Sequence, residues 1–431
     1  MTDVLTTWAG SHTFRGGPLV HPTSVEEVAE LVAGARRVRA IGSRHSFHDL
    51  ADSPGTLVAL DRLDIPLEIR SDEGAPGTGA AGTTVTVGGG VRYGELARAL
   101  HAAGWALHTM ASLPHIAVAG TVATATHGSG DSAVNLAAAV RGLELVGAGG
   151  EVRHLGPQDD ELAGSVVALG ALGVVTRVTL AVEPTFDVAQ EVWLDLPWET
   201  ALGRFDDLMG SAYSVSLFTD WRGGAVQQVW RKHRVLDASW TTPPAGDELA
   251  GARRAPGPVH PVPGVDPVAC TQQGGVPGPW HERLPHFRLE FTPSAGAELQ
   301  SEYLVPRARA IEAIEAVRAL RDRVSPLLQV SEIRSVAGDD LWLSTAAGGG
   351  HVGLHFTWLP LRDEVEAVLP AIEAALAPFQ ARPHWGKLFA DRDRSLAGLY
   401  PRWADFRELV TRRDPDGVFG NAYLARHGLR D

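Results

Sequence analysis

The sequence predicts an α+β protein with more than one domain. The chain has 431 residues, more than one hydrophobic core usually organises, so two or three domains are expected. Its first part mixes short helical patterns with many strand patterns and hairpins. After Glu183-Pro184, further alternating strands are combined with two amphipathic helices, which is typical of α+β layers. We therefore expect the first domain boundary at this dipeptide.

The first region opens with a clear helix start. Thr23 or Ser24 can cap the helix because glutamates follow at 26 and 27. The apolar stripe of this helix is expected to consist of Val25, Val28, Leu31 and Val32. Strands are predicted at Val38–Ile41, Leu57–Leu60, Thr83–Val87, Leu143–Val146, Val152–Leu155 and Leu172–Val182, with a hairpin turn at Gly147–Gly150 and a short helix at Leu162–Leu169.

A glycine run after the third of these strands resembles a nucleotide-binding turn but has the wrong spacing. Gly88, Gly89 and Gly90 precede a helical pattern. The motif Gly-x-Gly-x-x-Gly would then require glycine at position 93, which is Tyr93. We therefore reject a Rossmann site there.

The second region alternates strands with two helices. The segment Leu236–Gly264 is rich in Pro, Gly and Ala without periodicity, so a surface loop is expected. A helix beginning at Pro306 is expected to bury Ile311, Ile314, Val317 and Leu320, and a second helix is predicted at Asp363–Leu376. Strands are predicted at Val188–Leu196, Tyr213–Phe218, Gln227–Trp230, His286–Phe291, Glu302–Val305, Leu328–Val336 and Val352–Leu359.

Composition excludes several classes of function. Apolar residues make up 44% and charged residues 21%, as in a globular protein. The net charge of −13 argues against nucleic acid, because phosphate binding needs a basic face. The single cysteine, Cys270, excludes an internal disulfide and a cysteine metal cluster. No stretch resembles a signal peptide or a membrane span, so a cytoplasmic enzyme or binding protein is expected.

One strand end is the first candidate for chemistry. The buried pattern Val38–Ile41 runs into Gly42 and Ser43, where backbone N–H groups and a small hydroxyl can approach a ligand closely, and His45 projects from the turn. A glycine loop of this kind is common in α/β proteins. Its importance comes from a second stretch of small residues, Ser112–Gly130, which could enclose the same ligand.

Two further strands carry polar residues on one face. Side chains two residues apart in a strand point to the same face, so Glu332 and Arg334 form one pair, and His355 and Thr357 another. A solvated face with a surface ion pair is the simpler alternative. The segment Trp385–Lys387 favours a site instead, because it brings a rigid aromatic and a rare lysine.

Lysine is unusually scarce in this chain. Of 38 basic residues, 36 are arginine, and the two lysines are Lys232 and Lys387. A lysine kept against such a bias can be required as a compact ammonium donor. We assign that role to Lys387, and we interpret Lys232 as a remnant without function.

Other catalytic sites lack their signatures. His108, His115 and His127 are not accompanied by His-Glu-x-x-His spacing, so no metal site is expected. A Gly-x-Ser-x-Gly elbow is also missing, including around Ser129, which makes a Ser–His–Asp hydrolase improbable.

With these residues in hand, the chain closely resembles the alditol (xylitol) oxidases of the vanillyl-alcohol-oxidase flavoprotein superfamily. The resemblance runs nearly from end to end. It is carried by Gly42–Phe47, Met110–Gly120, Thr126–Gly130, Leu169–Val175, Ala212–Trp221, Val276–Phe287, Glu332–Arg334, His355–Trp358 and Arg382–Lys387.

The resemblance implies a two-domain FAD-linked oxidase fold. Residues 1–184 would form the FAD-binding domain, 185–380 the α+β substrate (cap) domain, and 381–431 a C-terminal segment that returns to the FAD domain and the active site. His45 would be bonded covalently to the flavin 8α-methyl group. The other residues expected to hold FAD are Ile41, Gly42, Ser43, Arg44, Ser46, Phe47, Ser112, Gly120, Thr121, Ala123, Thr124, Gly128, Gly173, Val175 and His384. Arg44 is a departure, since family members often have glycine there.

The resemblance also implies the reaction. Ser112, Glu332, Arg334, Thr357 and Lys387 would bind a polyol such as xylitol or sorbitol, whose hydroxyls each need a donor or an acceptor. Hydride would leave C1 for flavin N5, with Glu332, Arg334 and Lys387 as the catalytic residues and the two cations stabilising the developing alkoxide. His355 and His384 are second choices for orienting the flavin or a proton path. O2 would then be reduced to hydrogen peroxide.

Two alternatives stay open. The same fold hosts aldonolactone oxidases and dehydrogenases, and oxygen access near Ala111 would separate oxidase from dehydrogenase. A polyol-binding protein without catalysis is the alternative from another class. A monomer is expected.

Overall fold

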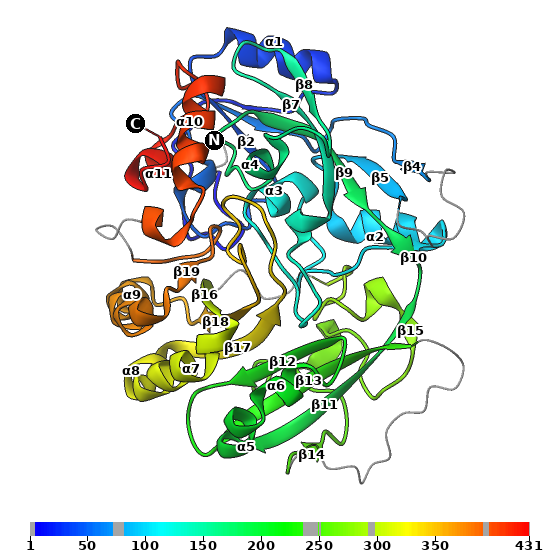
Figure 1. The fold of residues 1–431 in the computed structure, drawn as a ribbon, viewed down its shortest axis with the longest axis vertical. Helices are drawn as coiled ribbons and strands as arrows, with labels where there is room; N and C mark the ends of the chain where they lie inside the picture. The colour runs from blue at the N-terminus through cyan, green and yellow to red at the C-terminus, as the bar shows by residue number, and fades with distance from the viewer. Residues whose placement is uncertain are drawn as a thin grey trace.

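The computed structural model describes residues 5–71, 82–235, 249, 251–291, 298–390 and 396–430. Two large sheets organise it, one formed by the N-terminal part of the chain and one by the middle and later parts (Figure 1). No helix within the described ranges combines the length and the apolar character needed to cross a membrane.

The first large sheet is antiparallel and has the strand order β4-β5-β9-β7-β8. Every second residue of β9 is buried, which is the alternation that the sequence predicts for a strand with one face on the core. The hairpin of β7 and β8 is confirmed. The bounds are β4 (Glu68–Arg70), β5 (Thr84–Gly88), β7 (Val140–Val146), β8 (Val152–Leu155) and β9 (Val174–Ala181).

A small parallel sheet supplies the loop around His45. Its order is β1-β3-β2, and the carboxyl end of β2 leads directly into Gly42. The predicted helix start is confirmed, because the Ser24 hydroxyl accepts a hydrogen bond from the Glu27 N–H. The elements of this part are β1 (Leu19–Val20), α1 (Val25–Gly34), β2 (Val38–Ile41), η1 (Asp49–Ala51), β3 (Thr56–Ala59), α2 (Tyr93–Ala102), β6 (Trp105–Ala106), α3 (Val118–Ala123), η2 (Leu136–Ala139), α4 (Leu162–Val166) and β10 (Glu183–Pro184).

The second large sheet has the order β14-β11-β13-β12-β17-β18-β16-β19, and β15 also pairs with β11. All its pairings are antiparallel. Its strands are β11 (Asp187–Pro197), β12 (Ser214–Thr219), β13 (Ala225–Val235), β14 (Arg253–Arg254), β15 (Gly278–Pro279), β16 (Leu299–Pro306), β17 (Leu328–Val336), β18 (His351–Trp358) and β19 (Arg382–Pro383).

The two faces of this sheet differ in chemistry. Leu217, Ile333 and Leu354 pack in one core cluster with residues of the helices α7 and α9, which lie along one side of the sheet (Figure 1). The alternate residues of the same strands, including Glu332 and His355, occupy the opposite face. The helical elements are α5 (Trp198–Gly203), α6 (Phe205–Met209), η3 (Pro267–Ala269), η4 (Trp280–Glu282), η5 (Arg307–Arg309), α7 (Ala310–Ala319), α8 (Arg321–Val324), η6 (Ser325–Leu327), α9 (Arg362–Leu376) and η7 (Ala377–Phe379).

Some predictions for this region are wrong. Residues 286–291 form a loop with one isolated bridge between Cys270 and Phe287, because they pack on neighbouring loops without a strand partner. Ile311 is 40% exposed, so the buried stripe of α7 lacks it. The expected loop 236–264 lies partly outside the described residues. Within it, β14 pairs with β11.

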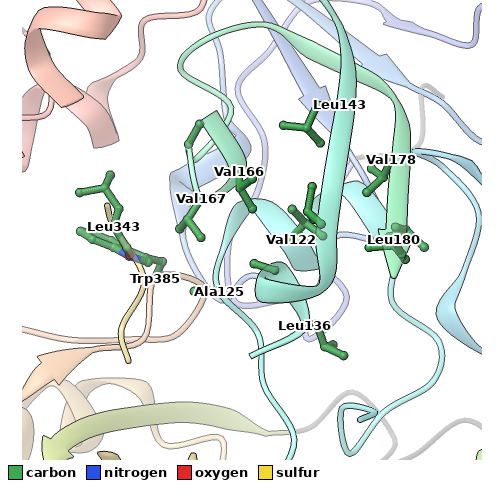
Figure 2. Close-up of a cluster of buried hydrophobic side chains, with 14 of the residues drawn as sticks. Val122, Ala125, Leu136, Leu143, Val166, Val167, Val178, Leu180, Leu343 and Trp385 are labelled. Atoms are coloured by element: carbon green, nitrogen blue, oxygen red, sulfur yellow. The ribbon is translucent and has the colours of Figure 1, made fainter. Parts of the chain in front are cut away.

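The end of the chain packs on the N-terminal part. The elements η8 (Leu396–Leu399), α10 (Trp403–Arg413) and α11 (Ala422–Arg426) contribute to the same core cluster as β5 and β9. Trp385 and Leu343 lie beside Val166 and Val167 in that cluster (Figure 2). This packing is compatible with a C-terminal segment that returns to the first domain. The boundaries at 184 and 380 stay a prediction.

Candidate functional site

A cavity of about 880 Å³ lies between the loops of the first part and the polar face of the second large sheet. Its size is in the range of cofactor and small-molecule sites. Nearly all site residues predicted from the sequence line it: Ile41, Gly42, Ser43, Arg44, His45, Ser46, Phe47, Ser112, Gly120, Thr121, Ala123, Thr124, Gly173, Val175, Glu332, Arg334, Thr357, His384 and Lys387. Gly128 is the exception, because it packs against the backbone of Met110, where a Cβ would approach the carbonyl oxygen to 2.5 Å.

His45 lines this cavity, and its ring nitrogens are unused by the protein. Both nitrogens are buried and have no hydrogen-bond partner among the described residues, and the ring stacks on Trp8 at 5.0 Å. Burial lowers the pKa of His45 to about 4, so the imidazole is neutral at neutral pH. A neutral ring nitrogen with a free lone pair is able to act as a nucleophile.

Arg44 adopts a backbone conformation that suits glycine. Its φ is +62°, in the left-handed region where a Cβ costs about 1–2 kcal/mol. Its guanidinium donates to the Thr6 carbonyl at 3.1 Å, and the Trp8 N–H donates to the Arg44 carbonyl. These bonds to the N-terminal segment stabilise the strained turn before His45.

Another part of the cavity wall combines glycines with a buried cation. Gly120 would place a Cβ in open space, since nothing lies within 4 Å. Gly89 and Gly90 also line the cavity, so a glycine run that we rejected as a Rossmann motif contributes to the wall. Arg39 is 2% exposed and donates to four backbone carbonyls, and no carboxylate pairs with it in the described part of the chain. A buried cation without a counter-ion favours an anionic ligand nearby.

The polar end of the cavity confirms the predicted strand faces. Glu332 on β17 is directly opposite His355 on β18, and His355 is opposite Glu302 on β16. The segment around Lys387 is tied to the same place, because the Phe47 N–H donates to the Gly386 carbonyl and the His384 N–H to the Glu302 carbonyl. The tail therefore joins the His45 loop to the polar sheet face.

Glu302 is the residue that sequence reasoning missed. Arg334 donates two nitrogens to its Oε1, at 2.9 and 3.2 Å, and the Lys387 ammonium donates to its Oε2 at 2.5 Å. His127 lies 3.3 Å from Oε1. The sequence does predict a strand at Glu302–Val305, and an acidic residue at the start of an apolar strand is the pattern that could have indicated Glu302 as a site residue.

Ionisation in this cluster follows from these contacts. Burial alone raises the pKa of Glu302, but Arg334 and Lys387 hold it well below its usual range. The same competition between burial and Arg334 keeps the pKa of Glu332 low. Burial and the nearby Lys387 lower the pKa of His355 to about 4. Burial lowers the pKa of Lys387, and Glu302 opposes this. The site therefore combines two carboxylates of lowered pKa with Arg334, Lys387 and an imidazole that is neutral at neutral pH.

Glu302→Gln is expected to destabilise the protein by about 3–5 kcal/mol near neutral pH, because buried Lys387 loses its carboxylate partner and Arg334 keeps only the more distant Glu332. The pKa of Glu302 is lowered in the folded state. Its contribution is thus full above the unfolded value, about 4.3, and disappears as pH falls through the folded value. Urea unfolding from pH 7 to 3 measures this.

Glu312→Gln is the matched control for that experiment. Glu312 pairs with Arg309 on the surface, where both side chains are about half exposed, so we expect a change below about 1 kcal/mol. An equal loss in both variants, or a Glu302→Gln loss that does not shrink in acid, would contradict the assignment.

Lys232 corrects a second prediction. It is 1% exposed, and its ammonium donates to the carbonyls of Leu284 and Pro285 and to His286 Nδ1. His286 Nε2 lies 3.0 Å from Glu332 Oε1. The lysine that we interpreted as a remnant thus lies directly behind the polar site.

His127, Glu302 and His384 have ligand atoms within 4.8 Å of one another, which is a possible metal geometry. Both Glu302 oxygens already accept from cations. A metal ion would be repelled by Arg334 and Lys387, so this arrangement favours an ion-pair network over a metal centre.

Family comparisons agree with the cavity. Residues 18–156 match the family model "FAD binding domain", and residues 297–427 match "D-arabinono-1,4-lactone oxidase". An alditol oxidase from Streptomyces sp. (strain IKD472) is 49% identical over 429 residues, covering 98% of this chain and 99% of the relative. An L-gulono-1,4-lactone dehydrogenase from Mycobacterium tuberculosis is 30% identical over 441 residues, covering 99% of each chain.

Solved structures share the fold at low identity. Cholesterol oxidase from B. sterolicum superposes with a TM-score of 0.78 at 14% identity, covering 98% of this chain and 96% of that chain. A solvent-stable cholesterol oxidase gives 0.77 at 16% identity, covering 99% and 97%. Together with the mixed helices and sheets, these matches confirm the α+β, two-domain FAD-binding fold.

Proposed function

Because the chain belongs to the alditol oxidases of the vanillyl-alcohol-oxidase flavoprotein superfamily, we propose that its cavity oxidises the terminal C1 hydroxyl of polyols such as xylitol and sorbitol. The chain is an FAD-dependent oxidoreductase of alditols. The acceptor O2, the product hydrogen peroxide and the covalent link belong to the proposal. The observation that supports it most is that a single cavity is lined both by the neutral His45 and by the hydrogen-bonding side chains of Glu332, Arg334 and Lys387.

The residues present fit FAD. A neutral, unpartnered imidazole at His45 suits attachment to the flavin 8α-methyl group. Gly120 leaves room for close approach of a ligand to the backbone, and Arg39 supplies a buried positive charge for the anionic diphosphate. His384, which is 4% exposed, would help to orient the group.

FAD, when bound, supplies the hydride acceptor and passes the two electrons on to O2, so that an alcohol and O2 become an aldehyde and H2O2. The protein positions the alcohol. Glu332 is ionised and can accept from substrate hydroxyls, while Ser112 and Thr357 offer hydroxyls at the cavity wall. Arg334 and Lys387, both fixed by Glu302, provide preorganised positive charge where the substrate oxygen becomes an alkoxide.

A lactone substrate is the less supported alternative. The family model over residues 297–427 and the 30% identical dehydrogenase point to it, but the identity to the alditol oxidase is 49% over almost the whole chain. A non-catalytic polyol-binding protein would not need an unpartnered histidine in the cavity.

The purified yellow protein is expected to release peroxide with xylitol or sorbitol and not with L-gulono-1,4-lactone. The 1,4-lactone lacks free hydroxyls at C1 and C4, because these oxygens form its ester ring, and a site built to pair with each hydroxyl of an open-chain polyol rejects analogues lacking them. Steady-state peroxide assays over polyols of different length and the lactone test this. Turnover of the lactone alone would overturn the proposal, and reduction of a dye without peroxide would assign a dehydrogenase.

A monomeric state in the cytoplasm is also part of the proposal. The single cysteine is buried and free, which is compatible with a reducing compartment. Size-exclusion chromatography with light scattering measures the oligomeric state.

A further inference from the structure

Lys387 lines the polar end of the cavity, and Lys232 lies behind it, in contact with the lining residue His286. Lys232 donates to His286 Nδ1 at 3.1 Å, and Lys387 donates to His355 Nδ1 at 2.8 Å. Each histidine then places Nε2 on a cavity group, His286 on Glu332 and His355 on Thr357. With 36 arginines elsewhere in the chain, the same lysine–histidine arrangement occurs at both lysines.

We call the chain of hydrogen bonds Lys232–His286–Glu332 the first relay, and Lys387–His355–Thr357 the second. The direction of the first relay follows from which of its groups can donate a proton and which can only accept one. An ammonium group has three donors and no acceptor, and an ionised carboxylate has acceptors alone. Burial and Lys232 lower the pKa of His286 to about 4, so its ring carries one proton at neutral pH. Glu332 places that proton on Nε2, because an ionised carboxylate 3.0 Å away can only accept, and Lys232 in its ammonium form donates to the remaining lone pair on Nδ1.

The Lys232 position suits a lysine, and the contacts around Nζ oppose the burial that lowers the pKa of this lysine to about 7. Three acceptors surround Nζ, namely the carbonyl oxygens of Leu284 and Pro285 and His286 Nδ1. Three tetrahedral N–H bonds can converge on such a set, whereas the planar fork of an arginine points its donors outward. This explains why lysine stands here in a chain that otherwise uses arginine.

We propose that Lys232 is a positioning residue of the polyol site, which acts through the Nε2–H tautomer of His286 to hold Glu332 as a hydroxyl acceptor. The inference rests on the proposed function and names a residue behind its site. One oxygen of Glu332 is occupied by His286, and the carboxylate is thereby oriented toward the cavity.

The second relay makes Thr357 a hydrogen-bond donor toward the cavity, whereas the first keeps Glu332 as an acceptor. With Lys387 donating to Nδ1, the neutral His355 ring carries its proton on Nε2, which faces the Thr357 hydroxyl at 3.1 Å. That hydroxyl then keeps its own proton for an acceptor in the cavity. Arg334 donates to Ser112 Oγ at 3.1 Å with the same effect. The cavity therefore presents an acceptor at Glu332 and donors at Thr357 and Ser112. A polyol can satisfy this pattern, because each of its hydroxyls both donates and accepts.

Lys232→Met is expected to raise the KM for xylitol about ten-fold or more, the size of a lost hydrogen bond to a charged group. The limiting rate of flavin reduction at saturating xylitol should change less than about three-fold, because Arg334 and Lys387 stay in place. In a His286→Gln background, whose amide can donate to Glu332 without help, Lys232→Met should have little further effect on KM.

Thr271→Val is the matched control. Thr271 also donates to the Pro285 carbonyl, at 2.8 Å, but it does not donate to the imidazole ring of His286. Simple loosening of the 284–286 loop would raise KM in Thr271→Val as much as in Lys232→Met, and that result would overturn the proposal. So would a Lys232→Met effect that is undiminished in the His286→Gln background.

Histidine ¹⁵N NMR of the holoprotein tests the relay without any substrate. The His286 signal, assigned by its loss in His286→Gln, is expected to show a protonated Nε2 and an unprotonated Nδ1. The reverse tautomer would overturn the proposal even if xylitol turns over. If no polyol reduces the wild-type flavin, the proposed function fails, while this measurement still decides the relay.

If Lys232→Met does not fold, two variants of His286 test the same proposal. His286→Asn places an amide near Lys232 and leaves Glu332 without a donor, whereas His286→Gln keeps the donor to Glu332. We expect a raised KM for xylitol in the first variant and a nearly unchanged KM in the second. Equal KM values in both would contradict the relay.

Discussion

Lys387→Met is expected to slow the reduction of the flavin by xylitol by about 10²–10³-fold, while the protein stays yellow and keeps its flavin. The Lys387 ammonium is held between Glu302 and His355 at the polar end of the cavity, so it is preorganised before any negative charge develops on the substrate oxygen. Methionine has a similar length and no charge. Anaerobic stopped-flow absorbance measures the rate directly.

Arg309→Met provides the control for general loss of a cation, since Arg309 lies on the surface with Glu312. Its reduction rate should match that of the wild type. Thermal unfolding of Lys387→Met is needed beside the kinetics, because Glu302 loses one of its two cationic partners. An unchanged rate of anaerobic reduction would remove Lys387 from the mechanism.

His45→Ala is expected to abolish covalent flavin altogether, so that acid precipitation leaves the flavin in the supernatant. The expectation rests on ring nitrogens that are buried in the cavity without a partner in the described chain. In the wild type, the flavin should remain with the pellet and with the tryptic peptide 45–62, which follows the cleavage site at Arg44.

His48→Gln is the matched control, because His48 lies in the same peptide and lines the same cavity. Its nitrogens are already used, Nε2 by the Trp385 carbonyl and Nδ1 by the Leu50 N–H. This variant should retain covalent flavin. Flavin that stays on precipitated His45→Ala would move the attachment to another residue.

Local patterns predicted much of the fold. The strand β17 was found with its observed bounds, and β18 and α9 were placed to within one residue, because each has strong periodicity. The loop 286–291 was not recoverable in this way. Its apolar and aromatic residues give the pattern of a strand, but its backbone forms only one isolated bridge, between Phe287 and Cys270, which local sequence does not indicate.

The candidate site was predictable where its residues share one local element. Period-two alternation put Glu332 and Arg334 on one face of a strand, and the glycine loop marked His45. Period two also indicated Thr357, the scarcity of lysine indicated Lys387, and the family resemblance added Ser112; the structure brings all of them to one cavity.

Sequence alone thus determined the α+β class, most elements and the face on which the acid and the arginine lie, because these depend on neighbours a few residues apart. Tertiary structure decided the roles of Glu302 and Lys232. Their hydrogen-bond partners come from strands and loops 32 to 85 residues away in the chain, and an ionised group has no stable place in a core until those partners surround it.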